Sequence, residues 1–100
     1  EVEQVLDEQP GVAESAVVGV PHPDFGEAVV GVVVLEPGAR VDVEATLRAA
    51  ALRLANYKRP KRLVSVDELP RNTMGKVQKA RLRELYGALF VDDGGSAQRG

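Results

Sequence analysis

A lysine within residues 69–77, which read LPRNTMGKV, is placed where its side chain could act on a ligand. Pro70, Asn72 and Gly75 are turn formers, so this stretch is predicted to be an exposed loop that ends at Lys76. A lysine beside a glycine hinge, at the junction of a loop and a helix, points outward and can reach an anion. The simpler interpretation is a solvated lysine in a surface turn, and residue spacing by itself favours it.

A Walker-type phosphate loop is excluded by two positions. That motif has a glycine five residues before its Gly-Lys pair, and a Ser or Thr directly after the lysine. Here Pro70 stands at the first glycine position, and Val77 follows Lys76 without a hydroxyl for a magnesium ion. The lysine loop therefore needs another explanation.

A second group of candidate residues combines aromatic rings with cations. Phe25 lies in a turn rich in proline and glycine, and Tyr57, Lys58 and Arg59 come directly before Pro60. An aromatic side chain can stack on an adenine ring, and arginine can form paired hydrogen bonds with phosphate. The alternative is that Tyr57 is buried under a sheet and Arg59 belongs to a surface ion pair.

The lysine loop resembles the last core motif of the adenylate-forming enzymes, which include acyl-CoA synthetases, peptide-synthetase adenylation domains and luciferases. That motif usually reads P-x-T/N-x-x-G-K, and its lysine is the catalytic one. Four further segments resemble the small C-terminal domain of this family in the same order: residues 1–6, 12–21, 24–27 and 57–61. The resemblance covers residues 1 to about 86. It is strongest to the CoA ligases, in particular to those that act on malonate or fatty acids.

The resemblance implies a role for each candidate residue. Lys76 would be the catalytic lysine of adenylation, and the CoA nucleotide would contact Phe25, Tyr57, Lys58 and Arg59. The whole enzyme would join a small carboxylic acid to ATP as an acyl-adenylate, and would then transfer the acyl group to CoA. ATP and Mg²⁺ would bind mainly to a larger N-terminal domain of the same chain, whose motifs are not among these 100 residues.

The resemblance also implies how the chain is organised. Residues 1–90 would form the C-terminal lid domain of a cytoplasmic acid-thiol ligase. Independently of the resemblance, the Gly-, Asp- and Ser-rich composition of residues 91–100 predicts a disordered tail. The lid is expected to fold alone but to have no activity alone. No signal peptide is visible, although the chain begins as if a preceding segment had been removed.

Two alternatives remain open. A matching loop also occurs in adenylation domains that pass the acyl group to a carrier protein. A non-catalytic module could instead bind nucleic acid through residues 53–83, which hold ten basic and two acidic side chains. Against this, no recognised nucleic-acid motif is present, and residues 1–52 hold ten acids and two arginines. The basic region could equally be an ordinary surface whose cations pair with those acids.

A length of 100 residues allows at most one domain in this chain. Its composition predicts an aliphatic core. Apolar residues make up 44% of the chain, but there are only two Tyr, two Phe and no Trp. No cysteine is present, and the single histidine, His22, has no partner His or Cys. We therefore expect no metal site in this chain. The longest apolar run, residues 28–35, is too short to span a bilayer.

Periodicity predicts the elements that must position these loops. Helices are expected over residues 1–9, 43–54 and after Lys76, and strands over residues 12–20, 28–35 and 63–66. The first two strands should pair antiparallel, and the second should be covered on both faces. Asp42 should cap the middle helix, whose buried stripe should be Val43, Leu47, Ala50, Ala51 and Leu54. The last helix should bury Val77, Leu82, Leu85 and Leu89. The order α-β-β-α-β-α predicts a small α+β sandwich, with helices packed on a short mixed β-sheet.

Overall fold

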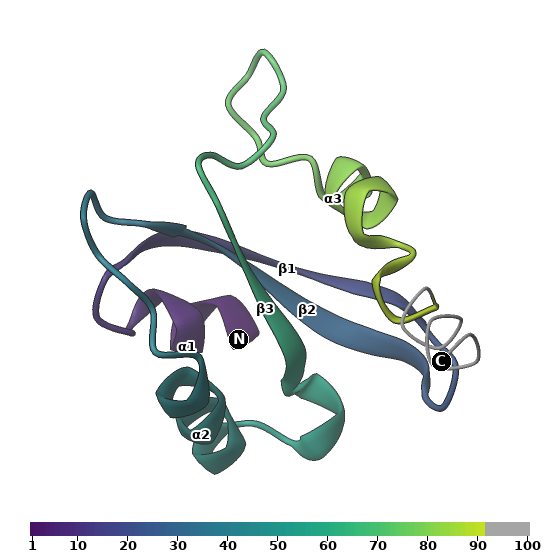
Figure 1. Ribbon diagram of the computed structural model, residues 1–100. Coiled ribbons are helices and arrows are strands. Elements are labelled where there is room, and N and C mark those ends of the chain that lie inside the picture. The colour runs from purple at the N-terminus through teal and green to yellow at the C-terminus, as the bar shows by residue number, and fades with distance from the viewer. Residues whose placement is uncertain (92–100) are drawn as a thin grey trace, which may run out of the picture.

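The computed structural model describes residues 1–91, in which helices pack on one β-sheet (Figure 1). The helices are α1 (Val2–Asp7), α2 (Val43–Arg53), the short 3-10 helix η1 (Asn56–Lys58) and α3 (Lys79–Tyr86), and the strands are β1 (Val12–His22), β2 (Gly26–Leu35) and β3 (Pro60–Val66). The α+β class and the order α-β-β-α-β-α confirm the sequence prediction. The expected tail, residues 91–100, lies outside the described residues except for Val91.

The sheet is mixed, with β2 between the other two strands. β1 pairs antiparallel with β2, so that Val18 lies opposite Val30, and β3 pairs parallel with β2, so that Val32 lies opposite Val64. The predicted antiparallel pairing is confirmed, and the turn between the two strands spans residues 23–25. Two adjacent parallel strands need a crossover connection, and α2 supplies it between β2 and β3.

The central strand β2 is buried on both faces, as predicted from its nearly unbroken apolar run. Val30 and Val32 are fully buried in a cluster with Leu82 of α3. Val33 points to the opposite face, where α1 and α2 pack, and it is also fully buried. Gly31 shares that face, and a Cβ placed on it would lie only 2.9 Å from a methyl carbon of Leu6. Each buried valine side chain contributes about 1.5–3 kcal/mol to folding.

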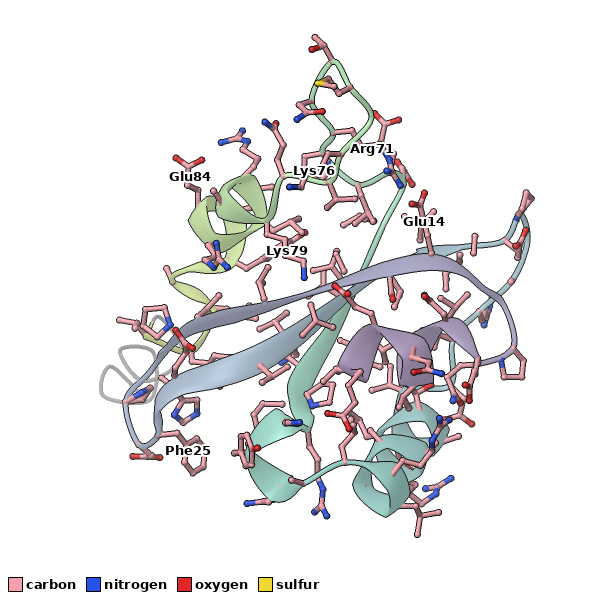
Figure 2. The ribbon with its side chains drawn as sticks, turned by 180° about the vertical axis from the view of Figure 1, so that it is seen from behind. Glu14, Phe25, Arg71, Lys76, Lys79 and Glu84 are labelled. Carbon is pink, nitrogen blue, oxygen red and sulfur yellow. The ribbon has the colours of Figure 1, made fainter. Side chains whose placement is uncertain are left out.

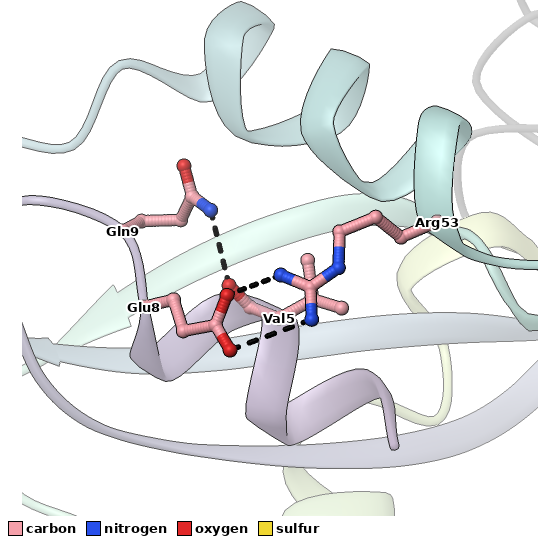
Figure 3. A network of polar contacts seen from close by, with 4 residues as sticks. All are labelled: Val5, Glu8, Gln9 and Arg53. Carbon is pink, nitrogen blue, oxygen red and sulfur yellow. Dashed lines mark hydrogen bonds and ion pairs between the residues drawn. The ribbon is translucent and has the colours of Figure 1, made fainter.

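A polar contact links the two helices on that second face (Figure 3). Arg53, at the end of α2, forms an ion pair with Glu8, which follows α1, and its Nη2 also lies 3.4 Å from the second carboxylate oxygen. The hydrogen bond from Arg53 lowers the pKa of the Glu8 carboxyl. Next to this pair, Gln9 Nε2 donates to the Val5 carbonyl at 3.1 Å and helps to end α1. The contact holds α1 and α2 together at the protein surface.

The start of α2 is as expected, but its buried stripe differs. Asp42 accepts a hydrogen bond from the Ala45 N–H at 3.0 Å, which confirms the predicted N-cap. Thr46 and Ala50 are buried, whereas Val43, assigned to the buried stripe from sequence, is 42% exposed. Val43 is the first helical residue and lies beyond the part of α2 that packs on α1.

The last helix begins later than predicted. The backbone of Val77 pairs with that of Arg71 in an isolated bridge, so α3 starts only at Lys79. Leu82 is 1% exposed, but Leu85, also expected to be buried, is 53% exposed. α3 therefore meets the sheet along a narrow stripe that leaves Leu85 outside it.

We expect Leu82→Ala and Leu85→Ala to separate in stability. Truncating the buried Leu82 leaves a cavity under α3 and should lower the free energy of unfolding by about 2–5 kcal/mol. Leu85→Ala removes the same atoms from an exposed site and should change it by less than about 0.5 kcal/mol. Urea unfolding followed by circular dichroism measures both values. Equal losses would contradict the orientation of α3 described here.

Candidate functional site

The loop that carries Lys76 is held in shape by the side chain of Asn72. Its Oδ1 accepts hydrogen bonds from the backbone N–H groups of Met74, at 2.9 Å, and Lys76, at 3.0 Å. The Asn72 N–H donates to the Lys76 carbonyl at 2.9 Å, and the Gly75 N–H donates to the Asn72 carbonyl at the same distance. Gly75 has a φ of +84°, which other residues adopt only with strain. The backbone at Lys76 is thus defined although the loop is exposed.

The side chain of Lys76 is available to an external anion. The loop projects away from the sheet between β3 and α3 (Figure 1), and Lys76 is exposed. Within residues 1–91 its ammonium group makes no hydrogen bond and no ion pair, whereas the cations on either side, Arg71 and Lys79, are both paired with carboxylates. The predicted exposed loop is confirmed, and the catalytic role of Lys76 stays a prediction.

Much of the charge separation along the sequence is neutralised inside the domain. Four acids from the first fourteen residues pair with four bases from residues 53–79, and these pairs are Glu1–Lys58, Glu3–Lys79, Glu8–Arg53 and Glu14–Arg71. A substantial part of the basic region is therefore engaged in intramolecular contacts, as the simpler interpretation of the charge pattern required.

Among the four paired glutamates, Glu3 has the least exposed side chain, at 36%. Its Oε2 accepts from Lys79 Nζ at 2.9 Å and from the Val17 N–H, on the outer edge of β1, at 2.8 Å. Burial alone would raise the pKa of the Glu3 carboxyl, but these two hydrogen bonds, together with the nearby positive charges, outweigh it and lower the pKa. Lys79 and Val17 are thereby connected, and the start of α3 is joined to α1 and β1.

The aromatic candidates meet at a pocket of about 260 Å³ near the start of β3. Phe25 comes from the turn between β1 and β2, Tyr57 from η1, and Arg59 from the segment just before β3. Tyr57 is 77% exposed and Phe25 is 59% exposed, so both rings are open to a ligand. The alternative of a Tyr57 buried under the sheet is wrong. The residues that line the pocket are Phe25, Glu27, Ala28, Val29, Asn56, Tyr57, Arg59 and Lys61.

The two basic candidates beside this pocket differ. Arg59 donates from Nε to the Leu54 carbonyl at 3.0 Å, which orients its guanidinium at the pocket wall and leaves it outside the ion pairs described above. Lys58 does not line the pocket. Its ammonium group pairs with Glu1 instead, and this hydrogen bond raises the pKa of Lys58. Of the four residues assigned to the CoA nucleotide, the pocket therefore brings together three.

Lys61 is a pocket residue that sequence reasoning missed. Its Nζ lies 4.8 Å from the centre of the Phe25 ring, a cation–π contact. A usable signal was present, because Lys61 stands two residues after Arg59 in extended chain, and alternate residues of a strand share a face. The sequence prediction placed Lys61 in a loop and began the strand only at residue 63, whereas β3 begins at Pro60, so this spacing was not used.

His22 supports the pocket from behind. Its ring centre lies 4.5 Å from that of Phe25 and 4.9 Å from that of Phe90. Its Nδ1 accepts a hydrogen bond from the Asp24 N–H at 3.0 Å, which shapes the turn that presents Phe25. In residues 1–91 no group of three or more His, Cys, Asp or Glu residues is placed to hold a metal ion.

The pocket and the lysine loop lie at opposite ends of the domain. Figure 2 shows Phe25 at one extremity and Lys76 at the other, with the sheet between them. The reason is the position of β3: Arg59 precedes the strand and the lysine loop follows it, and seven residues of strand extend roughly 20 Å.

Within residues 1–91 no helix is long and apolar enough to cross a membrane.

A family model and similar proteins of known activity point to the same enzyme family. Residues 1–76 match the model of the AMP-binding enzyme C-terminal domain. The chain is 47% identical over 87 residues to a salicylyl-CoA synthase/salicylate adenylyltransferase from Streptomyces sp, and 47% identical over 91 residues to a 4-chlorobenzoate–CoA ligase from Pseudomonas sp. (strain CBS-3). These matches cover 85% and 88% of the chain, but only 16% and 17% of the relatives.

A solved structure has the same fold as this chain. It is ATP-bound MatB from Rhodopseudomonas palustris, with a TM-score of 0.85 and 52% sequence identity. The match covers 89% of this chain and 18% of that protein. The chain thus spans less than one fifth of each of these three proteins.

We expect Asn72→Ala to loosen the lysine loop without unfolding the domain. The change removes the acceptor shared by Met74 and Lys76, and each lost hydrogen bond is worth about 0.5–1.5 kcal/mol. Amide hydrogen exchange at Met74 and Lys76 should become faster, whereas exchange in β2 should not change. Asn72→Asp keeps an oxygen acceptor and should retain most of the protection. Unchanged exchange in Asn72→Ala would show that the side chain does not hold the loop.

Proposed function

Because the chain belongs to the AMP-binding enzyme C-terminal domain family, we propose that it is the C-terminal domain of an ATP-dependent acyl-CoA ligase. The whole enzyme converts a small carboxylic acid and ATP to an acyl-adenylate and pyrophosphate. It then transfers the acyl group to the thiol of CoA and releases AMP. The names of the similar CoA ligases support this reaction class, and an N-terminal adenylation domain of the same chain supplies the rest of the site.

Lys76 provides the cation for adenylation in this proposal. The carboxylate and the α-phosphate of ATP are both anionic, and a positioned positive charge stabilises the negative charge that develops as they react. The observation that carries the assignment is an exposed lysine, without a partner in residues 1–91, on a loop whose backbone is hydrogen-bonded around it. Lysine suits the task as a compact charge on a long stem.

The pocket at Phe25 is the proposed site of the CoA nucleotide. Its two exposed rings offer faces for an adenine, and Arg59 and Lys61 offer charge for a phosphate. Glu27 also lines the pocket, so a phosphate is expected on the side of the two cations. Lys58, paired with Glu1, contributes at most to the general positive potential.

The separation of the two regions supports a lid that works in two orientations. A domain that carries its adenylation lysine at one end and its CoA pocket at the other cannot present both to one N-terminal active site at once. Rotation between the half-reactions would present them in turn. ATP and Mg²⁺ are assigned mainly to the N-terminal domain in this proposal, on the family resemblance of the chain.

A carrier protein is the alternative acceptor of the acyl group. A carrier delivers its thiol on a phosphopantetheine arm without the nucleotide of CoA, so the basic aromatic pocket favours free CoA. A nucleic-acid role is disfavoured, because four of the basic residues it would use are paired within the domain. Pyrophosphate release by the full-length enzyme with a panel of carboxylic acids, followed by assay of CoA thioester, tests the proposal. Failure to form an acyl-adenylate from any acid would contradict it.

In the full-length enzyme, Lys76→Ala should impair adenylation selectively. Removing a preorganised charge from a reaction centre typically costs about 100- to 1000-fold in rate. Thioester formation from a preformed acyl-adenylate should stay near the wild-type rate, because Lys76 is then turned away. The two half-reactions are measured separately by pyrophosphate release and by CoA thioester formation. An equal loss in both would contradict this selectivity and would mean that Lys76 is structural or that its loop serves both orientations.

Arg59→Ala should weaken the use of CoA without slowing adenylation. A charge-assisted hydrogen bond to phosphate is worth about 1.5–3 kcal/mol, which corresponds to a rise of about 10- to 150-fold in the KM for CoA. Partial exposure places the expected effect at the lower end of that range. Arg48→Ala is the matched control, since Arg48 lies on α2 and, among residues 1–91, pairs only with Glu44 of the same helix.

Dephospho-CoA separates a phosphate contact from a loss of structure. If Arg59 meets the 3′-phosphate, the parent enzyme should prefer CoA over dephospho-CoA and Arg59→Ala should barely distinguish them. Because Arg59 also donates to the Leu54 carbonyl, adenylation by the variant is the check on folding. Equal discrimination by parent and variant would rule out that contact.

A further inference from the structure

The projecting lysine loop is tied back to the sheet by Arg71 (Figure 2). Nη1 of Arg71 donates to the Gly75 carbonyl at 2.7 Å, and Nη2 forms an ion pair with the Glu14 carboxylate on β1. The Gly75 carbonyl belongs to the peptide bond that leads into Lys76. A single guanidinium group therefore connects the backbone at Lys76 to a strand fifty-seven residues earlier in the chain.

Glu14 faces the loop because of its position in β1. Alternate residues of a strand share a face, and Glu14 is in phase with Ala16 and Val18, which are buried on the face that α3 covers. A β-bulge interrupts the register with β2 between Val12 and Glu14, and bulges redirect the side chains beside them. The carboxylate is thus held at the rim of the core, below the loop.

The two contacts made by Arg71 suit an arginine and no other cation. The planar guanidinium fork can engage two acceptors in different directions, whereas a lysine ammonium acts as a single point charge. The side chains of Arg71 and Glu14 are 42% and 38% exposed, so solvent screens the pair and its effect on global stability is small. Its structural consequence is local and falls on the position of the loop.

The loop is also tied on the other side of Lys76. Lys79, the first residue of α3, pairs with Glu3 at 2.9 Å, which fixes where the loop enters the helix. Of the two ties, only Arg71 contacts the peptide group adjacent to Lys76. The Lys79–Glu3 pair therefore positions the start of α3, whereas Arg71 positions the loop backbone next to Lys76.

We propose that Arg71, held by Glu14, is a positioning residue for Lys76, an inference that rests on the proposed role of Lys76 in adenylation. A catalytic charge must lie close to its productive place, since a displacement of about 1 Å can cost about 100-fold in rate. In this role Arg71 does not contact ATP or the carboxylic acid. It acts on the turnover of the adenylation step by restricting where the Lys76 ammonium group can be.

Glu14→Gln in the full-length enzyme is the direct test. It removes the negative charge that holds Arg71 while keeping the size of the side chain and the charge of Arg71. Because the hydrogen bond from Arg71 to Gly75 remains, we expect about a 10-fold fall in the kcat of adenylation, less than a full 1 Å displacement can cause. The KM for ATP should change by less than about twofold, and thioester formation from a preformed acyl-adenylate should be unchanged.

Glu84→Gln is the matched control. It makes the same chemical change in α3, where Glu84 pairs with Arg81 at 3.7 Å and both side chains are more exposed than those of Arg71 and Glu14. All kinetic constants of this variant should equal those of the parent. A similar fall in both variants would indicate a general effect of lost acidic charge and would overturn the proposal.

Coupling between the two residues distinguishes positioning from direct binding. Arg71→Ala should lower the same kcat, and the double variant Arg71→Ala/Glu14→Gln should lose no more than Arg71→Ala alone. Arg71→Lys should also lose kcat, because it keeps the charge but not the fork. A raised KM for ATP with kcat retained in Arg71→Ala would mean that Arg71 binds ATP itself, and would overturn the positioning role.

Lys76→Ala, measured in parallel, separates this inference from the proposed function. If Lys76→Ala loses adenylation while Glu14→Gln keeps the parent kcat, the positioning role is wrong and the proposed function stands. If Lys76→Ala retains adenylation, the proposed role of Lys76 fails and this inference fails with it. In the Lys76→Ala background, Glu14→Gln should cause no further loss, since there is no catalytic charge left to position.

Discussion

Burial of β2 on both faces is the constraint on which the rest of the structure depends. Val30 and Val32 must be covered from one side and Val33 from the other, and no single helix can do both. α3 covers the first face, and α1 with α2 covers the second. The parallel partner β3 then requires a crossover, and the same α2 that supplies cover provides it. Element order and layer arrangement follow from one strongly apolar strand.

The position of β3 in this sheet separates two kinds of chemistry. The aromatic and basic pocket is built at the start of the strand, where the turn at Phe25 and helix η1 come together. The lysine loop leaves from the other end of the strand and projects beyond the sheet, to which the Arg71–Glu14 ion pair connects it. Because a packed domain moves as one body, a rotation that brings one end toward a partner takes the other end away. This rigidity is consistent with the two-orientation lid proposed above.

Charge pairing decides which cations remain available. Glu1, Glu3, Glu8 and Glu14 all come from the start of the chain, and each neutralises a base from residues 53–79. These contacts are partly exposed, and they contribute more to the placement of loops and helices than to stability. Two of the four pairs occupy Arg71 and Lys79, the cations on either side of Lys76, whose own ammonium group has no partner within residues 1–91.

The sequence by itself determined the elements whose signal is local. The apolar run of β2, the Asp42 cap and the turn formers around Lys76 each specify a conformation through their own side chains, and the motif of the lysine loop pointed to the family. Only the tertiary structure decided which neighbours meet across long separations. Leu85 fits a helical stripe but faces solvent, Lys58 pairs with Glu1 rather than facing the pocket, and Lys61 joins Phe25. Such contacts depend on how helices and strands pack against one another, and a period of 3.6 or 2 residues carries no information about the partner on the other side.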